Sequence, residues 1–276
     1  NDARRQRQMC IRDRSNPEDY TNRGTIVTPL KDRIGSQILT HYPESIEIAK
    51  QITEQESRLN SQVISKIHIP EIARDIIEQI SFEARESDLV DKKSGVSARM
   101  SITSLQNLVS SAERRMIINN EKKTSIRMSD FNSVISSING KVELVYEGEE
   151  EGAEQVPYNL ISDAVKSLFN KYFPKIEKLS KPGEETPYDS LLEWFSQKQL
   201  VIGDSLNDNE YEKLLLEIID ARTIIDKYVK DLDDNDRFFF IEFILWGLES
   251  FNKLSILRTN NGIEFKDPFN NFINKI

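Results

Sequence analysis

Apolar residues recur every three or four positions along several stretches of the chain, a spacing that places them on one face of an α-helix. Four such stretches precede the middle of the sequence: one over 43–59, one that starts at Pro70, one that starts near Ser101, and one from Ser129 to Gly140. Proline suits the first turn of a helix, and glycine suits the position after its end, so both residues support these limits. The first half is therefore predicted to be helical.

The same helical spacing continues in the second half, over residues 157–173, 188–200, 208–230 and 235–257. Between the halves, apolar residues alternate with others over 142–146, which predicts a short strand at best. The sequence contains neither a repeat of fixed period nor a sustained heptad pattern. The predicted fold class is mostly α, with one loop-rich segment near the start of the chain.

The stretch EGEEEGAEQ at 147–155 is acidic, contains glycine and has no apolar anchor, a composition typical of an exposed connection. We therefore expect a helical domain over 43–148, an acidic linker over 149–156 and a second helical domain over 157–276. Residues 15–42 precede both domains and hold loop and strand-end sequence.

The first fourteen residues, NDARRQRQMCIRDR, differ from the rest in charge. They carry a balance of +3, whereas everything after them sums to −12. A basic arm that binds nucleic acid is one interpretation of this segment. However, RRQRQMCIRDRS resembles translated adapter sequence found at the ends of metagenomic proteins, so we expect residues 1–14 to be non-native.

Composition argues against nucleic-acid binding, a membrane-spanning segment, a disulfide framework and a zinc site. The net charge of −9 argues against nonspecific nucleic-acid binding, because the phosphate backbone selects basic surfaces. The longest apolar run, Phe238 to Trp246, is interrupted by Glu242 and is shorter than the roughly 20 residues needed to cross a bilayer. One cysteine and two histidines predict neither a disulfide framework nor a zinc site, and we expect a cytoplasmic protein.

Three short segments carry residue types suited to phosphate chemistry. NPEDY places Asn16 before a proline, as at the exit of a strand into a loop, and PLKDRIG places Arg33 after an acidic neighbour. SGVSARMSI places Arg99 just before a predicted helix. An arginine there can direct its planar fork at a phosphate, and the positive end of the helix adds to the attraction.

Taken in this order, NPEDYTNRGTIVTPLKDRIGSQILTHYPESIEIA and SGVSARMSITSLQNLVSSAERR resemble the back half of an AAA+ ATPase module of the magnesium-chelatase subunit I and MoxR-like family. The resemblance covers about 15–148 and is weaker beyond. It implies that residues 15–42 are the end of an α/β ATPase core and that 43–148 are its helical lid. Residues 157–276 would be the helical extension that some members carry.

The resemblance also implies roles for three residues. Asn16 matches the sensor-1 residue that orients the attacking water, and Arg33 matches the arginine finger that reaches the ATP of a neighbouring subunit. Arg99 matches the sensor-2 arginine of the lid, which contacts the nucleotide. Each has a simpler alternative: a turn for Asn16, a surface ion pair for Arg33, and a helix cap or a bridge to Glu113 for Arg99.

The chain departs from the family in what it lacks. It contains no GxxxxGK[ST] loop to hold the phosphates and no hydrophobic run ending in an acidic pair to hold Mg²⁺. ATP and Mg²⁺ are therefore expected in a full-length protein, while this fragment alone should bind neither. The resemblance implies ATP hydrolysis by the full-length protein, whereas this chain, which lacks both elements, is expected to be inactive alone.

Two hypotheses follow for function. In the first, the chain is a fragment of an ATP-hydrolysing motor that forms a hexameric ring and remodels a partner protein or assists metal insertion. In the second, it is a helical interaction module that binds a von Willebrand factor A-type partner without catalysis. Neither hypothesis includes a nucleic acid or a membrane as partner.

Other conspicuous residues are expected to be structural. Arg114 and Arg115 should lie on a solvated helix face. Phe238 and the aromatic residues that follow it should pack in a core rather than stack on bases. His41 and His68 have no neighbouring nucleophile in the sequence that would suggest a catalytic triad.

Overall fold

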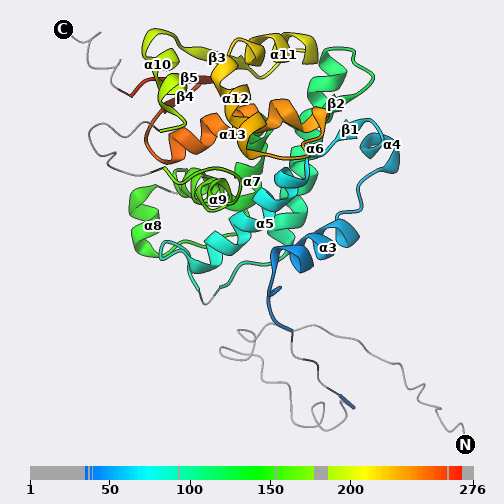
Figure 1. The fold of residues 1–276 in the computed structure, drawn as a ribbon. Helices are drawn as coiled ribbons and strands as arrows, with labels where there is room; N and C mark the ends of the chain where they lie inside the picture. The colour runs from blue at the N-terminus through cyan, green and yellow to red at the C-terminus, as the bar shows by residue number, and fades with distance from the viewer. Residues whose placement is uncertain are drawn as a thin grey trace, which may run out of the picture. The chain divides into compact units, whose positions relative to one another are not determined.

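The most apolar helix of the chain, α13 (Arg237–Ser250), is surrounded by other helices and buried on nearly all sides (Figure 1). An amphipathic surface helix would bury one stripe, whereas a helix that is apolar all round belongs in a core. Phe239, Phe240 and Phe243 are buried here, and Phe238 packs against the same core, which confirms the expected packing role of this aromatic run.

The structure is a computed structural model that describes residues 35–268, apart from 37, 39, 93, 153, 177–185 and 260. The chain divides after Tyr42, and the second unit, Pro43–Ile276, holds every named element. Its helices, in chain order, are α3 (Ile46–Glu56), α4 (Ser61–Ile64), α5 (Glu71–Glu86), α6 (Arg99–Ile118), η1 (Met128–Val134, a 3₁₀ helix), α7 (Ile135–Asn139), α8 (Tyr146–Glu151), α9 (Val156–Tyr172), α10 (Asp189–Gln197), α11 (Asp208–Leu216), α12 (Ile219–Tyr228), η2 (Asp234–Asp236, 3₁₀) and α13.

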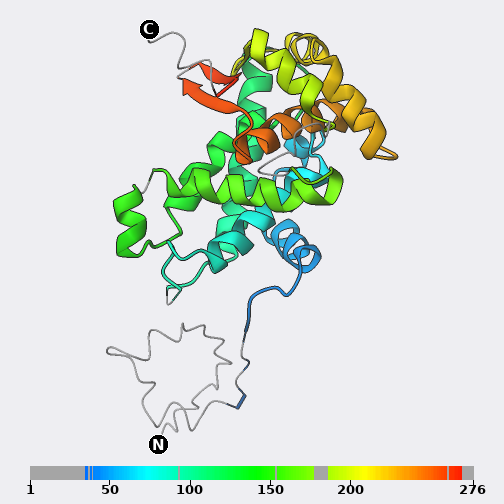
Figure 2. The ribbon, with the colours of Figure 1, turned by 60° about the vertical axis from the view of Figure 1, so that its left-hand side comes forward.

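Helix α5 lies between two layers. The helices α3 and α6 pack on one side of it, and α9 packs on the other, as both ribbon views show (Figures 1 and 2). The apolar positions that predicted these helices are the ones buried: Ile72, Ile76, Ile77 and Ile80 in α5, and Leu105, Leu108, Val109 and Ala112 in α6. Apolar spacing therefore located the main helices of the first half correctly.

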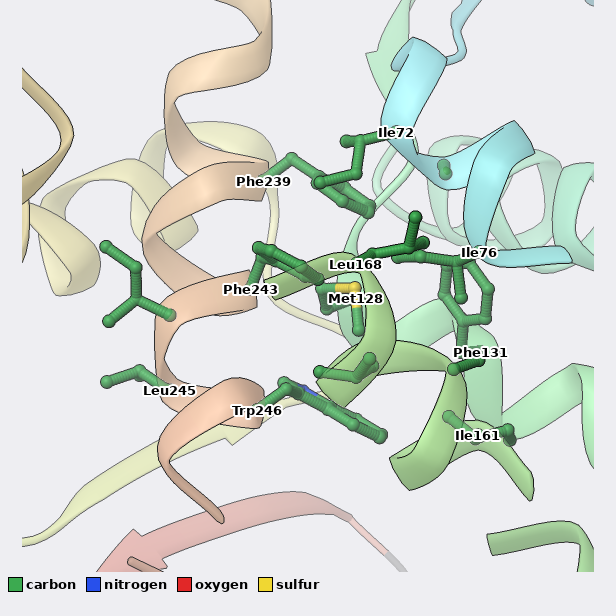
Figure 3. Close-up of a cluster of buried hydrophobic side chains, with 14 of the residues drawn as sticks. Ile72, Ile76, Met128, Phe131, Ile161, Leu168, Phe239, Phe243, Leu245 and Trp246 are labelled. Carbon is green, nitrogen blue, oxygen red and sulfur yellow. The ribbon is translucent and has the colours of Figure 1, made fainter. Parts of the chain in front are cut away.

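The hydrophobic core runs without interruption across the predicted linker. Residues 149–156 hold the end of α8 and the first residue of α9. Beyond them, α9 packs against both α5 and α13. Figure 3 shows Phe239, Phe243 and Trp246 of α13 pointing toward Leu168 of α9, with Ile76 of α5 in the same cluster. The helices on the two sides of residues 149–156 thus share one core, which the expected division into two domains does not describe.

The second half also contains a small sheet that the sequence analysis did not predict. Its antiparallel strands are ordered β3 (Leu200–Gly203), β5 (Gly262–Lys266), β4 (Ser255–Thr259). The predicted helix over 235–257 therefore ends at Ser250, and the one over 188–200 ends at Gln197. Buried apolar residues on one face of the sheet make the chain's last described strand part of the core.

Other local predictions need correction. The stretch predicted as one helix over 208–230 is two, α11 and α12. The helix expected from Ser129 is mostly the 3₁₀ helix η1, followed by the short α7. Residues 142–146 form no strand beyond a single bridge between Leu144 and Val90, and the other described strands, β1 (Ile67–His68) and β2 (Thr124–Ser125), are two-residue parallel partners. The fold is mostly α, as predicted.

Within the described ranges, no helix combines the length and the apolar character that crossing a membrane requires.

Candidate functional site

Of the three residues to which the resemblance assigns a role, Asn16, Arg33 and Arg99, only Arg99 is among the residues that the structure describes. Asn16 and Arg33 lie outside the described residues. Arg99 is the first residue of α6, and its side chain is exposed. The structure therefore places one of the three, at the loop-to-helix junction where the sequence predicted it.

The backbone around Arg99 is held by local hydrogen bonds. Its N–H bonds to the Ser97 hydroxyl at 3.2 Å, and its carbonyl accepts the Thr103 hydroxyl at 2.7 Å. The guanidinium itself makes no hydrogen bond or ion pair in the described part of the chain, including with Glu113. A positively charged group at the positive end of a 20-residue helix is left facing solvent, which is electrostatically unfavourable unless an anion is nearby.

The first turn of α6 is fixed to α5 by buried polar groups. The Ser101 and Ser81 hydroxyls lie 2.6 Å apart, and both side chains are buried. Glu78 of α5 lies beside Ser101, and burial raises the pKa of its carboxyl despite hydrogen bonding by Thr53 and Ser101. These contacts set the position from which Arg99 projects, although its own side chain stays free.

A second polar cluster lies near the other end of α6. Arg115 is buried, with 4% of its side chain exposed, and its guanidinium bonds to the Asp130 carboxylate at 3.0 Å and to the Ser125 carbonyl at 2.8 Å. The expectation that Arg115 lies on a solvated face is wrong, because this residue points inward; its neighbour Arg114 is exposed, as expected.

Arg127 joins the first half of the chain to α11. Its guanidinium bonds to the Asp208 carboxylate at 2.7 Å and to the Leu206 carbonyl at 2.9 Å, and it lies 4.0 Å above the ring of Tyr211. Its backbone N–H bonds to Asp130 at 2.9 Å. The two buried arginines therefore share Asp130, and a planar guanidinium suits both the carboxylate and the aromatic face.

Glu242 lies in the middle of α13 and is fully buried. Its Oε2 accepts the Met128 N–H at 3.0 Å and the Tyr211 hydroxyl at 2.7 Å. Its Oε1 has no hydrogen-bond partner among the described residues. Burial raises the pKa of the Glu242 carboxyl to about 7, and the phenol of Tyr211 offsets part of this rise.

This cluster, which we call the buried polar network, comprises Arg115, Arg127, Asp130, Asp208, Tyr211 and Glu242. Its members come from α6, η1 and the residue before it, α11 and α13. The start of α11 is set by a capping box in which the Asn207 and Glu210 side chains each bond to the other's backbone N–H. The sequence analysis missed the network, and its one visible signal was a lone glutamate inside an apolar run.

The chemistry available here is limited. Within the described residues, no group of three His, Cys, Asp or Glu side chains could hold a metal ion. The buried polar network is closed to solvent for the most part and pairs its charges internally, so it serves to join helices. Arg99, by contrast, is exposed, and its guanidinium has no partner among the described residues, a state it shares with Arg58; it differs from Arg58 in lying at the start of a helix.

Comparisons of the chain with protein-family models, with curated proteins and with solved structures find no match.

Proposed function

We propose that the chain is the C-terminal part of an ATP-hydrolysing AAA+ motor of the magnesium-chelatase and MoxR-like type, in which Arg99 contacts the nucleotide. The observation that carries this proposal is the unpaired guanidinium at the start of α6. A helix N-terminus is a ready site for an anion, and the planar guanidinium of an arginine matches the geometry of a phosphate. Both facts favour a phosphate as the missing partner.

The arrangement suits phosphoryl transfer, which is catalysed by positioning and by neutralising charge on the transferred group. In this proposal Arg99 acts from the lid onto the nucleotide of its own subunit. Arg33 would act as the finger on the neighbour's ATP, and Asn16 would orient the attacking water. The α/β ATPase core would lie upstream and would supply the phosphate loop and the Mg²⁺ ligands.

Several further features belong to the same proposal. If Arg33 acts on the ATP of a neighbouring subunit, the subunits have to assemble into a ring, and the resemblance implies a hexamer. ATP and Mg²⁺ would be bound by the full-length protein in the cytoplasm. The work done would be the remodelling of a partner protein or the insertion of a metal.

The experiment that tests the proposal uses the full-length gene product, obtained by extending the chain upstream. ATP binding and turnover are measured for the wild type, for Arg99→Ala, and for Arg74→Ala as a control. Arg74 is a half-buried arginine of α5, and its ion pair within the described part of the chain is a 3.9 Å contact with Glu71. We expect Arg99→Ala to weaken binding and turnover together, while Arg74→Ala leaves both unchanged. Unchanged nucleotide binding by Arg99→Ala would remove the sensor assignment.

A second candidate function is a protein-interaction module without catalysis. It is favoured by the outer face of the sheet, where Val201 and Leu257 both lie opposite Glu264 and are 50% and 45% exposed. The two apolar side chains flank Glu264 of the central strand β5, and for this mixed surface we propose a von Willebrand factor A-type protein as the partner. Leu257→Lys should abolish such binding, whereas Lys230→Ala, a change elsewhere on the surface, should not.

A further inference from the structure

We propose that the Glu242 carboxyl is a proton-controlled clasp that holds α11 and η1 against α13. This inference is independent of the proposed ATPase function. It rests on the place of Glu242 in the fold, where one carboxyl joins three elements that are far apart in the sequence.

The geometry makes Glu242 the meeting point of these elements. A single oxygen, Oε2, accepts from the backbone N–H of Met128, the first residue of η1, and from the hydroxyl of Tyr211 in α11. The second oxygen has no partner within the described residues. The two donors at Oε2 favour the ionised carboxyl, whereas burial disfavours its charge. Burial outweighs the donors here, so the protonated form is favoured up to near-neutral pH.

The charged and titratable groups around Glu242 come from known elements. Arg127, which precedes η1, favours the ionised carboxyl, and Asp130 of η1 opposes it. Tyr211 of α11 favours the ionised form as a donor. The indole of Trp246, one turn further along α13, also favours it, although its N–H makes no hydrogen bond among the described residues. Three other helices pack on α13. Helix α9 presents Tyr172 to it, η2 carries Asp234 and Asp236, and the buried residues of α12 carry no ionisable side chain. Desolvation outweighs these opposing effects and raises the pKa of the carboxyl.

Ionisation of Glu242 leaves a negative charge in the core with one oxygen unpaired. Water or a donor has to reach that oxygen, and the elements that cover it have to loosen. Helix α11 is the element that we expect to loosen first when Glu242 ionises. It is a nine-residue helix with two polar attachments. Its Asp208 pairs with Arg127 of the first half, and its Tyr211 bonds to Glu242 of α13. The expected result of raising the pH is faster opening of α11 and of the start of η1.

The test uses the chain with Trp194→Phe, which leaves Trp246 as its single tryptophan. Trp246 emission is recorded between pH 5.5 and 8.5, and we expect one transition with a midpoint near pH 7. Glu242→Gln should abolish this transition. Glu249→Gln, the same change on the same helix, should preserve it. Absence of the transition in the parent, or its persistence in Glu242→Gln, would overturn the proposal.

Two further measurements keep the test decisive if Glu242→Gln does not fold. In Tyr211→Phe, loss of the hydroxyl removes a donor to the ionised carboxyl, so the midpoint should move to higher pH; an unchanged midpoint would refute the clasp. Hydrogen exchange, corrected for the intrinsic effect of pH, should speed up across residues 208–216 between pH 6 and 8 in the parent. In Tyr211→Phe the same increase should begin at a higher pH, in step with its shifted midpoint. Uniform exchange across that range in the parent would also overturn the proposal.

Discussion

The ring of Phe169 occupies the space in which a side chain at Gly247 would begin. A Cβ built on Gly247 would lie 2.1 Å from Cδ2 of Phe169, far inside van der Waals contact. Phe169 belongs to α9 and Gly247 to α13, so the absence of a side chain at one position allows the two helices to approach closely. This contact lies within the second half of the chain, and α9 in turn packs on α5 of the first half.

The first prediction concerns Gly247→Ala. The added methyl collides with a fully buried ring that several aromatic neighbours hold in place. Overpacking of this kind costs roughly 1–3 kcal/mol, and the gain in helix propensity recovers at most about 1 kcal/mol. We expect a lower free energy of unfolding in chemical denaturation.

The control for this substitution is Gly140→Ala, at the end of α7. The nearest atom to a Cβ there is the Ser136 carbonyl oxygen at 3.4 Å, and the φ angle is −82°. Alanine fits that conformation, so the control should stay near the wild-type stability. A Gly247→Ala protein as stable as this control would contradict the packing of α9 against α13.

The second prediction is that residues 43–268 unfold in one transition. The core is continuous from α5 through α9 to α13, and separate domains would need separate cores. Calorimetry should therefore give a calorimetric enthalpy equal to the van't Hoff enthalpy, the mark of two-state unfolding. Two resolved transitions, with Gly247→Ala lowering only one of them, would restore the division at 149–156.

The third prediction concerns the buried ion pair of Arg115 and Asp130. Arg115→Leu leaves the Asp130 carboxylate buried without its main counter-charge, and breaking such a pair costs about 3 kcal/mol or more. Arg114→Leu changes the adjacent, exposed arginine and should cost less than about 0.5 kcal/mol. The measurement is the free energy of unfolding at pH 7 for both variants.

A double variant checks the cause of that loss. Because Arg115→Leu/Asp130→Asn removes the stranded charge, its cost should be smaller than the sum of the two single substitutions. Additive costs would mean that Arg115 stabilises the fold through packing of its methylene groups and not through its charge.

The spacing of apolar residues along the chain predicted the helices that bury one face. The apolar positions of α5, α6 and α9 repeat with the helical period, and a helix that packs on one side has to show that period. The same period also placed Arg115 on the buried face, since it follows Leu108 by two helical turns. Charge alone suggested that Arg115 was exposed, and the period was the better guide.

The parts that were missed have two different causes. The hairpin of β4 and β5 has Gly262 directly after its loop, where φ is +145°, and an asparagine before it, so a turn could have been predicted from the residues. The bond between Arg127 and Asp208 joins residues 81 apart, and no local pattern indicates it. Long-range polar pairs of this kind depend on how helices pack, which a single sequence does not state.

The fourth prediction gives the pH dependence that Glu242 imposes on stability. Its pKa is about 7 in the folded chain and near the ordinary value of 4.5 when unfolded. A raised pKa means that the folded state binds the proton more tightly, so this contribution is fully present below pH 4.5. It is lost as the pH rises from 4.5 to 7, by about 3 kcal/mol in total.

Glu242→Gln has no proton to lose at this position. The difference in unfolding free energy between Glu242→Gln and the wild type should therefore shift in favour of the variant between pH 5 and pH 8. Denaturant titrations at the two pH values measure it, and other titrating groups cancel in the difference. A difference that does not change with pH would show that Glu242 keeps one protonation state throughout.

The last prediction separates the two arginines in the full-length ring proposed above. Arg99 would act on the nucleotide of its own subunit, so Arg99→Ala should lower binding and turnover together. Arg33 would act on the neighbour's ATP, so Arg33→Ala should keep binding but lower turnover on the order of 10³-fold, or about 4 kcal/mol in the barrier.

Mixed rings decide between action in cis and in trans. Subunits with Arg33→Ala are combined with subunits that lack only the phosphate-loop lysine, and ATP turnover is measured against the ratio of the two. Some interfaces then join an intact phosphate loop to an intact finger, so activity should reappear. Arg99→Ala, combined with the same lysine-defective subunits, should show no such rescue, because each subunit's own site keeps one defect. Equal loss of binding in both variants, with no rescue in either mixture, would exclude the trans finger, and the argument for a ring would then fail with it.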